Sequence, residues 1–277
     1  MRFNPLFLFT IILVGAGCSQ TPAVQMPPAP TDVQATKPAI ERVTVQPSSS
    51  EPGDQTLRII LRGADGQELS ADDLKVVHEK KYHLLLVRDD LTEFQHLHPE
   101  FVDGSWRVTT TIPKSGTYHL YSDIAPLNEP TNVTRTSLRI GSNTMDPQSP
   151  TPQLVTMTDD IQVTLSSDVS PMSGMTHAWT FLVEKNGTPV AKIDPYLGAF
   201  GHAVLLEHGN PDEFVHVHPV TDSAPTDGRV IFEAAVPRPG RYTFFAQFKI
   251  DGVVRTFPLT VDVADSATLP AMDHSMH

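Results

Sequence analysis

Cysteine is nearly absent from this chain: the only one among its 277 residues is Cys18. A single thiol excludes an intrachain disulfide framework, so the folded part must be stabilised by the burial of apolar side chains. It also excludes a blue-copper centre and a thiolate zinc site in the folded part, because both need cysteine ligands there.

Basic residues are also few. The chain has 20 Lys and Arg against 32 Asp and Glu, which gives a formal net charge of -12. Because no cluster of Lys and Arg stands out, the sequence argues against nucleic acid as a partner. The chain also lacks a glycine-rich phosphate loop, a serine in a nucleophile elbow and a Cys–His pair. We therefore do not expect an enzyme.

The first residues predict export. A positive start, Met1-Arg2, precedes an apolar stretch over residues 6–17 that ends in small residues directly before Cys18. The stretch is too short to cross a bilayer as a stable helix, and residues 1–17 are typical of a signal peptide. The segment Gly15-Ala-Gly-Cys18 resembles a bacterial lipobox.

That resemblance implies a lipoprotein with a fatty acyl group, such as palmitate, on Cys18. The protein would then be anchored in the cell envelope, at the periplasmic face of the outer membrane in a Gram-negative cell. The alternative is ordinary signal cleavage that leaves a free thiol. Residues 18–53 are rich in Pro, Ala, Gln, Thr and Ser, and this composition predicts a semi-extended tether between anchor and folded part.

From Leu57 onward, short apolar segments alternate with Gly, Pro, Asp and Ser clusters, and no helical period exceeds two turns. This pattern is typical of strands. In the first half they are expected at 57–61, 82–87, 94–98, 106–112, 118–121 and 137–140. In the second half they are expected at 161–165, 179–183, 202–206, 214–218, 230–236, 242–248 and 257–263.

The strand pattern repeats, which predicts an all-β fold class with two tandem Ig-like β-sandwich domains. Residues 103–118 and 227–242 share Asp-Gly, an aliphatic residue before Pro, and Gly-x-Tyr at matching places. The first domain is expected at residues 54–144, followed by a linker at 145–156, the second domain at 157–264 and a Met- and His-rich tail at 265–277.

A histidine cassette occurs once in each half, and its three shared histidine positions account for six of the 12 histidines. Each copy has a histidine before an apolar run, then a polar turn, Glu-Phe, one spacer residue and His-x-His-Pro. The copies span His83–Pro99 and His202–Pro219. Their spacing differs by only one residue, which falls in the turn. The duplicated pattern therefore indicates that the histidines of both copies have the same function.

Folding each cassette into a hairpin brings its histidines together. If the first copy turns at Asp89-Asp90, His96 lies directly opposite His83. His98, two residues beyond His96, points to the same face of the sheet. The second copy turns around residues 208–210, and the extra loop residue keeps the equivalent pair opposed. The six predicted ligands are His83, His96, His98, His202, His216 and His218.

Three imidazoles with an open position suit a transition metal. Among divalent ions copper has the highest raw affinity for such a site, and zinc is the other candidate. The tail offers further soft donors for copper: Met272, His274, Met276 and His277. The cluster of Met172, Met175 and His177 is better explained by packing, because it enters an apolar strand.

The second cassette carries a further resemblance. The segment Asp194–His202, which includes Pro-Tyr-Leu-Gly-Ala, followed by Phe214–Pro219, is similar to a bacterial family of exported proteins. Members are described as secreted or heavy-metal-associated, with a YtkA-like or Ig-like β-sandwich. The similarity covers residues 160–250 closely and residues 57–125 weakly, where the histidines recur without the Tyr-Leu-Gly-Ala bend. It implies an envelope domain linked to copper handling.

Three hypotheses follow. The first is a lipid-anchored envelope protein that binds copper, or zinc, through two three-histidine sites in metal handling or resistance, with a metal transporter or metal chaperone as partner. The second is a non-catalytic binding or assembly module in which the histidines only fix loops. The third is a metalloenzyme that uses the open coordination position, although no acid–base group stands at a fixed spacing from the histidines.

Overall fold

The computed structural model describes residues 40–127, 129–142, 150–217, 219–220 and 223–268. The signal peptide, Cys18, residues 18–39 of the expected tether, His218 and Met272–His277 lie outside the described residues. Within the described part, no helix has the length and apolarity needed to cross a membrane. From Ile40 onward, the described residues form one compact unit.

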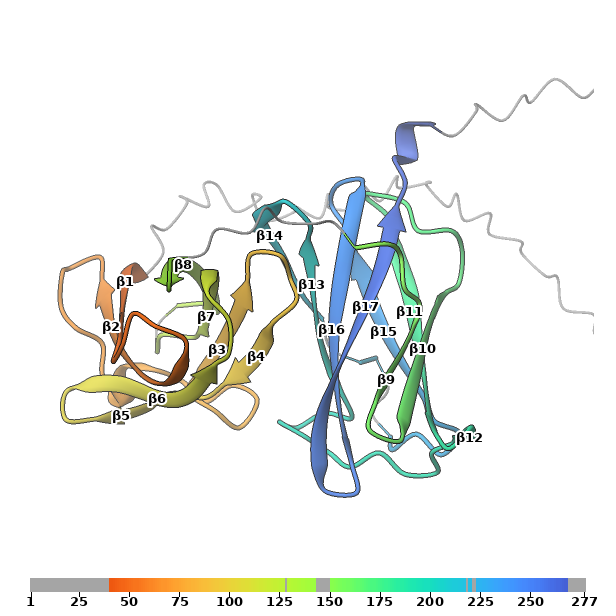
Figure 1. The fold of residues 1–277 in the computed structure, drawn as a ribbon, viewed down its shortest axis with the longest axis horizontal. Coiled ribbons are helices and arrows are strands. Elements are labelled where there is room, and N and C mark those ends of the chain that lie inside the picture. The colour runs from red at the N-terminus through yellow and green to blue at the C-terminus, as the bar shows by residue number, and fades with distance from the viewer. Residues whose placement is uncertain (1–39, 128, 143–149, 218, 221–222, 269–277) are drawn as a thin grey trace, which may run out of the picture. The chain divides into compact units, whose positions relative to one another are not determined.

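Residues 40–142 form a β-sandwich of two four-stranded antiparallel sheets (Figure 1). The first sheet has the order β1-β2-β6-β5, with β1 (Ile40–Pro47), β2 (Gly53–Gly63), β5 (Glu100–Val102) and β6 (Ser105–Ile112). The second has the order β4-β3-β7-β8, with β3 (Tyr82–Arg88), β4 (Phe94–Leu97), β7 (Gly116–Ile124) and β8 (Asn132–Ile140). A short 3-10 turn, η1 (Ala71–Asp73), precedes β3.

Residues 155–263 form the second β-sandwich. One sheet has the order β12-β11-β10-β9, with β15 also paired to β11. Its strands are β9 (Val155–Thr158), β10 (Ile161–Ser167), β11 (Thr176–Lys185), β12 (Thr188–Pro189) and β15 (Arg229–Ala235). The other sheet has the order β14-β13-β16-β17, with β13 (His202–Glu207), β14 (Asn210–Val217), β16 (Gly240–Ile250) and β17 (Val253–Val263). The turn η2 (Ser266–Thr268) follows.

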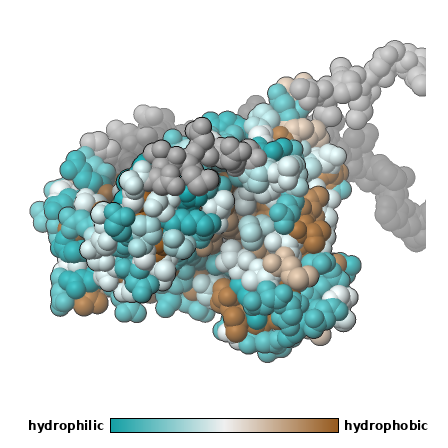
Figure 2. All heavy atoms as spheres, viewed as in Figure 1, coloured by the Kyte–Doolittle hydropathy of each residue, from teal (hydrophilic) through white to brown (hydrophobic). Residues whose placement is uncertain are grey.

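Each sandwich has its own core between its two sheets, which confirms the predicted fold class. In β2 the alternate residues Leu57, Ile59 and Leu61 are fully buried, as a strand with one face on a core requires. On the face shown in Figure 2, hydrophobic side chains form only small patches among hydrophilic ones.

The two sandwiches also share a corner characteristic of Ig-like folds. The Tyr118 hydroxyl donates to the Lys114 carbonyl at 2.9 Å, and the Tyr242 hydroxyl donates to the Arg238 carbonyl at 3.0 Å. Such a tyrosine bonds back to the backbone a few residues upstream, where it fixes the connection between the two sheets. The duplicated Gly-x-Tyr of the sequence is thus a duplicated structural device.

The predicted tether is wrong in its last part. Residues 40–47 form β1, which pairs with β2, so the first sandwich begins before the expected boundary at residue 54. Val43 and Ile40 are buried in the core, although the Pro- and Thr-rich segment around them has little apolar content. Similarly, β9 begins at Val155, inside the expected 145–156 linker.

The central strands β3 and β13 are buried on both faces. In β3, Leu84 and Leu86 pack in the core of the first sandwich. Leu85 and Val87 point the other way and belong to a third apolar cluster. That cluster, here called the interface cluster, draws on both sandwiches: Leu85, Val87, Tyr121, Val204, Leu206 and Phe245. The outer faces of the β3 and β13 sheets therefore pack against each other.

Candidate metal centre between the two sandwiches

The first cassette is a hairpin, but its register differs from the prediction. His96 lies opposite Leu85, not opposite His83. The turn is wider than a turn at Asp89-Asp90, because the Arg88 N–H donates to the Glu93 carbonyl and Leu91 adopts a left-handed conformation (φ 58°). The register shift is two residues, and an even shift keeps each side chain on its face. His83, His96 and His98 therefore still share one side.

The second cassette shows the same shift. His216 lies opposite Val204, where His202 was expected, and the ladder is irregular between Leu206 and Glu207. This irregularity accommodates the extra residue of the second copy. His218 lies outside the described residues, so the structure describes two of the three predicted ligands of this repeat.

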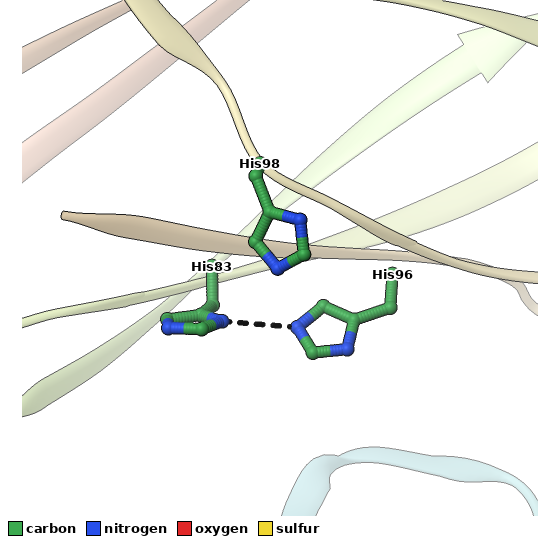
Figure 3. Close-up of side chains that lie close together, drawn as sticks. All are labelled: His83, His96 and His98. Carbon is green, nitrogen blue, oxygen red and sulfur yellow. Dashed lines mark hydrogen bonds between the residues drawn. The ribbon is translucent and has the colours of Figure 1, made fainter. Parts of the chain in front are cut away.

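His83, His96 and His98 form a compact group whose potential ligand atoms all lie within 4.8 Å of one another (Figure 3). The ring centroids of the three pairs are separated by 5.3 Å (His83–His96), 5.1 Å (His83–His98) and 4.8 Å (His96–His98). Two imidazoles bound to one tetrahedral ion have centroids about 5 Å apart, given metal–nitrogen bonds of about 2.0–2.1 Å. The group therefore matches the spacing of a three-histidine metal site.

The hydrogen bonds of these rings fix which nitrogen carries the proton. His83 Nε2 lies 2.9 Å from the Val77 carbonyl oxygen, and His96 Nδ1 lies 2.8 Å from Oε1 of Gln247. Since each oxygen accepts, both nitrogens donate, and the lone pairs of the neutral rings are at His83 Nδ1 and His96 Nε2. Those two atoms face each other at 3.1 Å.

Two lone pairs this close repel unless something lies between them. A hydrogen bond along the dashed line of Figure 3 would require one ring to be protonated or to give up its outer partner. Burial opposes protonation, because it lowers the pKa of His96 to about 3 and also lowers the pKa of His83. A cation bound to both nitrogens removes the conflict, since metal ligands must be neutral imidazoles.

His98 supplies a third, independent indication. Its Nε2 is buried and makes no hydrogen bond to any described residue. Burial also lowers the pKa of His98 to about 4, so the ring is neutral at physiological pH. A buried polar atom without a partner costs about 1–3 kcal/mol of folding free energy. A metal ion would satisfy it.

The histidines of the second repeat lie at the same interface. His202 Nε2 donates to the Tyr196 carbonyl at 2.8 Å, as His83 Nε2 does to Val77 in the first repeat. His216 Nδ1 donates to Oδ2 of Asp123, a residue of the first sandwich, at 2.8 Å. This is a carboxylate–histidine pair of the kind that orients metal ligands.

Contacts across the interface are reciprocal. Asp123 of the first sandwich corresponds in the repeat to Gln247 of the second, and each accepts from a histidine of the other sandwich. The aromatic rings follow the same rule. Phe94 of the first sandwich stacks on Phe245 of the second, with ring centroids 4.4 Å apart. The equivalent pair is Phe214 of the second sandwich on Tyr121 of the first, with centroids 5.0 Å apart. The two repeats therefore meet around a local pseudo-twofold axis.

A small cavity lies at the centre of this interface, with an accessible volume of about 10 Å³. Its polar lining is made by His83, His96, His202, His216, Asp123 and Gln247. A space of this size holds one water-sized occupant. Histidines of both repeats thus border one space, which cassette spacing did not predict. Because His218 lies outside the described residues, the predicted three-histidine site of the second repeat stays a prediction.

His78 was missed by the sequence analysis. Its ring lies 5.9 Å from that of His202, 6.4 Å from that of His216 and 6.2 Å from that of His83, centroid to centroid. His78 occupies the turn before β3 at the position that Leu197 occupies before β13. Because the second cassette has leucine there, comparing the two cassettes could not reveal it.

Among the described residues, the Met172, Met175 and His177 cluster does not join this group. His177 is fully buried, and its Nε2 lies 2.9 Å from the Met172 carbonyl, which favours the packing explanation. The predicted tail ligands Met272, His274, Met276 and His277 lie outside the described residues.

Fold and site together define a tandem Ig-like β-sandwich protein whose repeats enclose a group of histidines. The chain belongs to the family described as "Domain of unknown function (DUF8832)", whose profile matches twice, at residues 39–138 and 156–265. The two matches correspond to the two sandwiches. A comparison with curated proteins found no match.

Similar solved structures include invasin, described as a bacterial integrin-binding protein (12% identity, TM-score 0.26), which matches over 81% of this chain and 40% of its own. An Escherichia coli alpha-2-macroglobulin matches at 12% identity (TM-score 0.25) over 82% of this chain and 16% of its own. The D00-D0 domain of intimin matches at 11% identity (TM-score 0.24) over 81% of this chain and all of its own. The chain thus spans less than half the length of the first two.

Proposed function

We propose that this protein is an envelope protein that binds a transition metal ion, preferentially copper, at the interface between its two sandwiches, in metal handling or resistance. The first-repeat histidines His83, His96 and His98 are the ligands of this position. One observation carries the proposal. His83 Nδ1 and His96 Nε2 lie 3.1 Å apart, and each nitrogen directs a lone pair toward the other. Both rings are held in this tautomer by acceptors on their far side.

The donor set supports copper first and zinc second. Three neutral imidazoles suit either ion, and copper(II) binds more tightly than zinc to a given nitrogen site. Burial adds selectivity against protons, because the lowered pKa values of His96 and His98 keep both rings neutral in mildly acidic solution. Metal would therefore stay bound at pH values where an exposed histidine site releases it.

The second sandwich contributes by holding the ligands in place. Gln247 fixes the orientation of His96, and Phe245 stacks on Phe94, two residues before that ligand. Partners of this kind typically change metal affinity by about 10–100-fold. The metal affinity of the proposed site is therefore expected to depend on the contact between the two sandwiches.

The proposed location and partner rest on the sequence. The signal peptide and the lipobox-like Cys18 would anchor the protein to a membrane of the cell envelope. The tail, with Met272, His274, Met276 and His277, would capture copper or pass it to a metal transporter or chaperone, since thioether sulfur favours copper(I). The resemblance to exported heavy-metal-associated proteins agrees with this role.

Equilibrium titration with Cu²⁺ and Zn²⁺ tests the proposal. The protein should bind Cu²⁺ more tightly than Zn²⁺, and the pair His96→Ala/His98→Ala should weaken the tightest site by at least about 100-fold, since it removes two ligands of three. The counterpart pair His216→Ala/His218→Ala reports on the second repeat. A matched control is His208→Gln, because His208 bonds Thr243 and does not line the cavity. Unchanged affinity in both paired variants would contradict the proposal.

The second candidate is a non-catalytic binding or assembly module with structural histidines. It is favoured by the bonds from His83 and His202 to the backbone carbonyls of Val77 and Tyr196, which fix the turns before β3 and β13. It predicts that histidine substitutions lower thermal stability equally with and without metal. The metal site predicts instead that metal stabilises the wild-type chain by about 2.7 kcal/mol at 100 times Kd, and much less in the variants.

A further inference from the structure

We infer that the ion held by the first-repeat group, His83, His96 and His98, is copper in its monovalent state, copper(I), and that Gln247 sets this preference. The inference rests on the proposed function and deepens it. It names the ionic species that the site takes, and it names a residue of the second sandwich that selects for this species without being a ligand.

The donors of this group carry no charge. Among the described residues, the potential ligands whose atoms lie within 4.8 Å of one another are three imidazoles, with no carboxylate. The acceptors behind two of the rings are neutral as well: the Val77 carbonyl behind His83 and the Gln247 amide behind His96. The cost of removing an ion from water rises with the square of its charge, so it is about four times larger for a dication. Compared with a site that includes a carboxylate, this set therefore favours a monovalent ion.

The three rings are almost equally spaced (Figure 3), with centroids 4.8, 5.1 and 5.3 Å apart. Copper(II) prefers a tetragonal arrangement. Three ligands in such a plane place two rings on opposite sides of the ion, with centroids roughly 6 Å apart for metal–nitrogen bonds of about 2.0 Å. No pair in this group is that far apart. Copper(I) has a filled d shell, as zinc has, and accepts the trigonal or tetrahedral arrangement that equal spacings indicate.

The cavity beside the group adds little to this set of donors. Its accessible volume of about 10 Å³ holds one water-sized occupant, so it has room for at most one further small ligand. The carboxylate that lines it, Asp123, accepts from His216 Nδ1 at 2.8 Å and does not belong to the ligand group. Spacing thus favours copper(I) over copper(II), and charge favours it over zinc.

Gln247 is oriented so that a neutral oxygen faces His96. Its Nε2 donates to Thr256 Oγ1 at 3.0 Å, and its Oε1 accepts from His96 Nδ1 at 2.8 Å. Asp123, at the equivalent position of the first sandwich, presents a carboxylate to His216 instead. A negative charge behind a ligand stabilises a dication more than a monocation, because the Coulomb energy is proportional to the charge of the ion. The amide of Gln247 therefore avoids stabilising copper(II).

Parallel competition titrations measure the preference. The background is the full chain without its thiol and without the donors of its tail: Cys18→Ala, Met272→Ala, His274→Ala, Met276→Ala and His277→Ala. Copper(I) is titrated against bicinchoninate under nitrogen with ascorbate present, and Cu²⁺ and Zn²⁺ are titrated against nitrilotriacetate. The tightest site should bind copper(I) at least about tenfold more tightly than either dication. The pair His96→Ala/His98→Ala should abolish this preference.

The substitution Gln247→Glu tests the role of the amide. It keeps the size of the side chain, and the Thr256 hydroxyl can donate to the new carboxylate, so the fold is retained. It should tighten Cu²⁺ binding and narrow the ratio of the two copper affinities by about 10–100-fold. The control Gln67→Glu adds the same charge to an exposed loop after β2 and should leave the ratio unchanged. Asp123→Asn removes a charge at the equivalent position and should widen the ratio.

Each contrary outcome has a distinct meaning. A parent chain that binds Cu²⁺ or Zn²⁺ as tightly as copper(I) overturns the inference and leaves the proposed function intact. If Gln247→Glu and Gln67→Glu give the same ratio, the role of Gln247 is wrong. A preference that persists in His96→Ala/His98→Ala overturns its assignment to this group. A parent chain that binds no copper removes the proposed function and this inference with it.

Discussion

The two repeats have the same framework but differ in the side chains they bring to the interface. Both have the turn, the doubly buried central strand and the tyrosine corner, and both hold their first cassette histidine by a backbone carbonyl. They differ in two places. His96 is held by an amide, Gln247, but His216 by a carboxylate, Asp123. The turn before the central strand is His78-Glu79 in one repeat and Leu197-Gly198 in the other.

Duplication supplied the geometry of the interface, and a few substitutions made it asymmetric. A symmetric pair would present two equal ligand sets. Here His216 donates to a carboxylate and His96 to an amide, and a carboxylate partner makes an imidazole the stronger donor to a bound metal ion. The additional imidazole, His78, comes from the first repeat alone. The two halves of the centre are therefore expected to differ in affinity.

The largest expected effect comes from separating the repeats. Phe245 is buried and stacks on Phe94 with an interplanar angle of 7°. Phe245→Ala should lower the free energy of unfolding by about 3–5 kcal/mol, the usual cost of removing a buried phenylalanine. It should also weaken the first copper site by at least about tenfold, although Phe245 is no ligand, because the orientation of His96 depends on docking.

A matched core variant separates docking from stability. Phe257 is equally buried but lies within the core of the second sandwich. Phe257→Ala should lower the free energy of unfolding by a similar amount, measured by urea denaturation, and leave copper affinity unchanged. If Phe245→Ala and Phe257→Ala bind copper with the same affinity as each other, the interface does not contribute to the site.

Exchanging the two holding groups should have the next largest effect. Asp123→Asn should weaken copper binding at the His216 position by about 10–100-fold, and Gln247→Glu should strengthen the His96 position by a similar factor. Isothermal titration of each variant and of the pair resolves the two positions. If Asp123→Asn leaves both affinities unaltered, the asymmetry has no chemical consequence.

Acid should destabilise the metal-free protein. The pKa of His96 is lowered by burial to about 3 and that of His98 to about 4, while histidine in the unfolded chain titrates near 6.5. Between these values the unfolded chain binds more protons than the folded one, so stability falls as the pH drops from about 6.5 toward 3. Urea denaturation at pH 7, 5 and 4 measures the slope.

The variant His96→Gln serves as the control for acid, because it removes the group with the lowest pKa of the set. Its stability should fall less between pH 7 and pH 4 than that of the wild-type chain. A wild-type slope no steeper than that of His96→Gln would mean that the buried rings do not resist protonation.

The smallest effect concerns the turn. Glu79→Gly gives the first repeat the glycine of the second and should raise the free energy of unfolding by up to about 1 kcal/mol, because a left-handed residue is relieved. The reverse change, Gly198→Glu, should lower it by a similar amount. Thermal denaturation of both variants checks the pair, and a loss of stability in Glu79→Gly would contradict the equivalence of the turns.

Much of the fold was predictable because strand periodicity is local. The strands around Leu57, Tyr82 and Phe257 lie where alternation and turn residues indicated. The fold class and the shared face of His83 and His96 were likewise correct, since that face depends only on the parity of the register. The predicted register between β3 and β4 was wrong by two residues. The register depends on the length of the Arg88–Glu93 turn, and the sequence of this segment is compatible with more than one turn length.

The composite site was not predictable from cassette spacing, because it depends on packing between repeats. One signal was present: the run His83–Val87 is apolar without alternation, which is typical of a strand buried on both faces. It implied a partner for the outer face, and the duplicated run His202–Leu206 implied the same. His78 gave no such signal, and β1 was hidden in a Pro- and Thr-rich segment whose apolar residues are few.

The most direct test is nuclear Overhauser spectroscopy of the zinc-loaded chain, directed at ring protons across the interface. We expect cross peaks between Phe94 and Phe245, whose ring centroids lie 4.4 Å apart, and between Tyr121 and Phe214, whose centroids lie 5.0 Å apart. If both pairs lack cross peaks, the sandwiches do not meet through these faces. The histidines of the two repeats would then not share a centre.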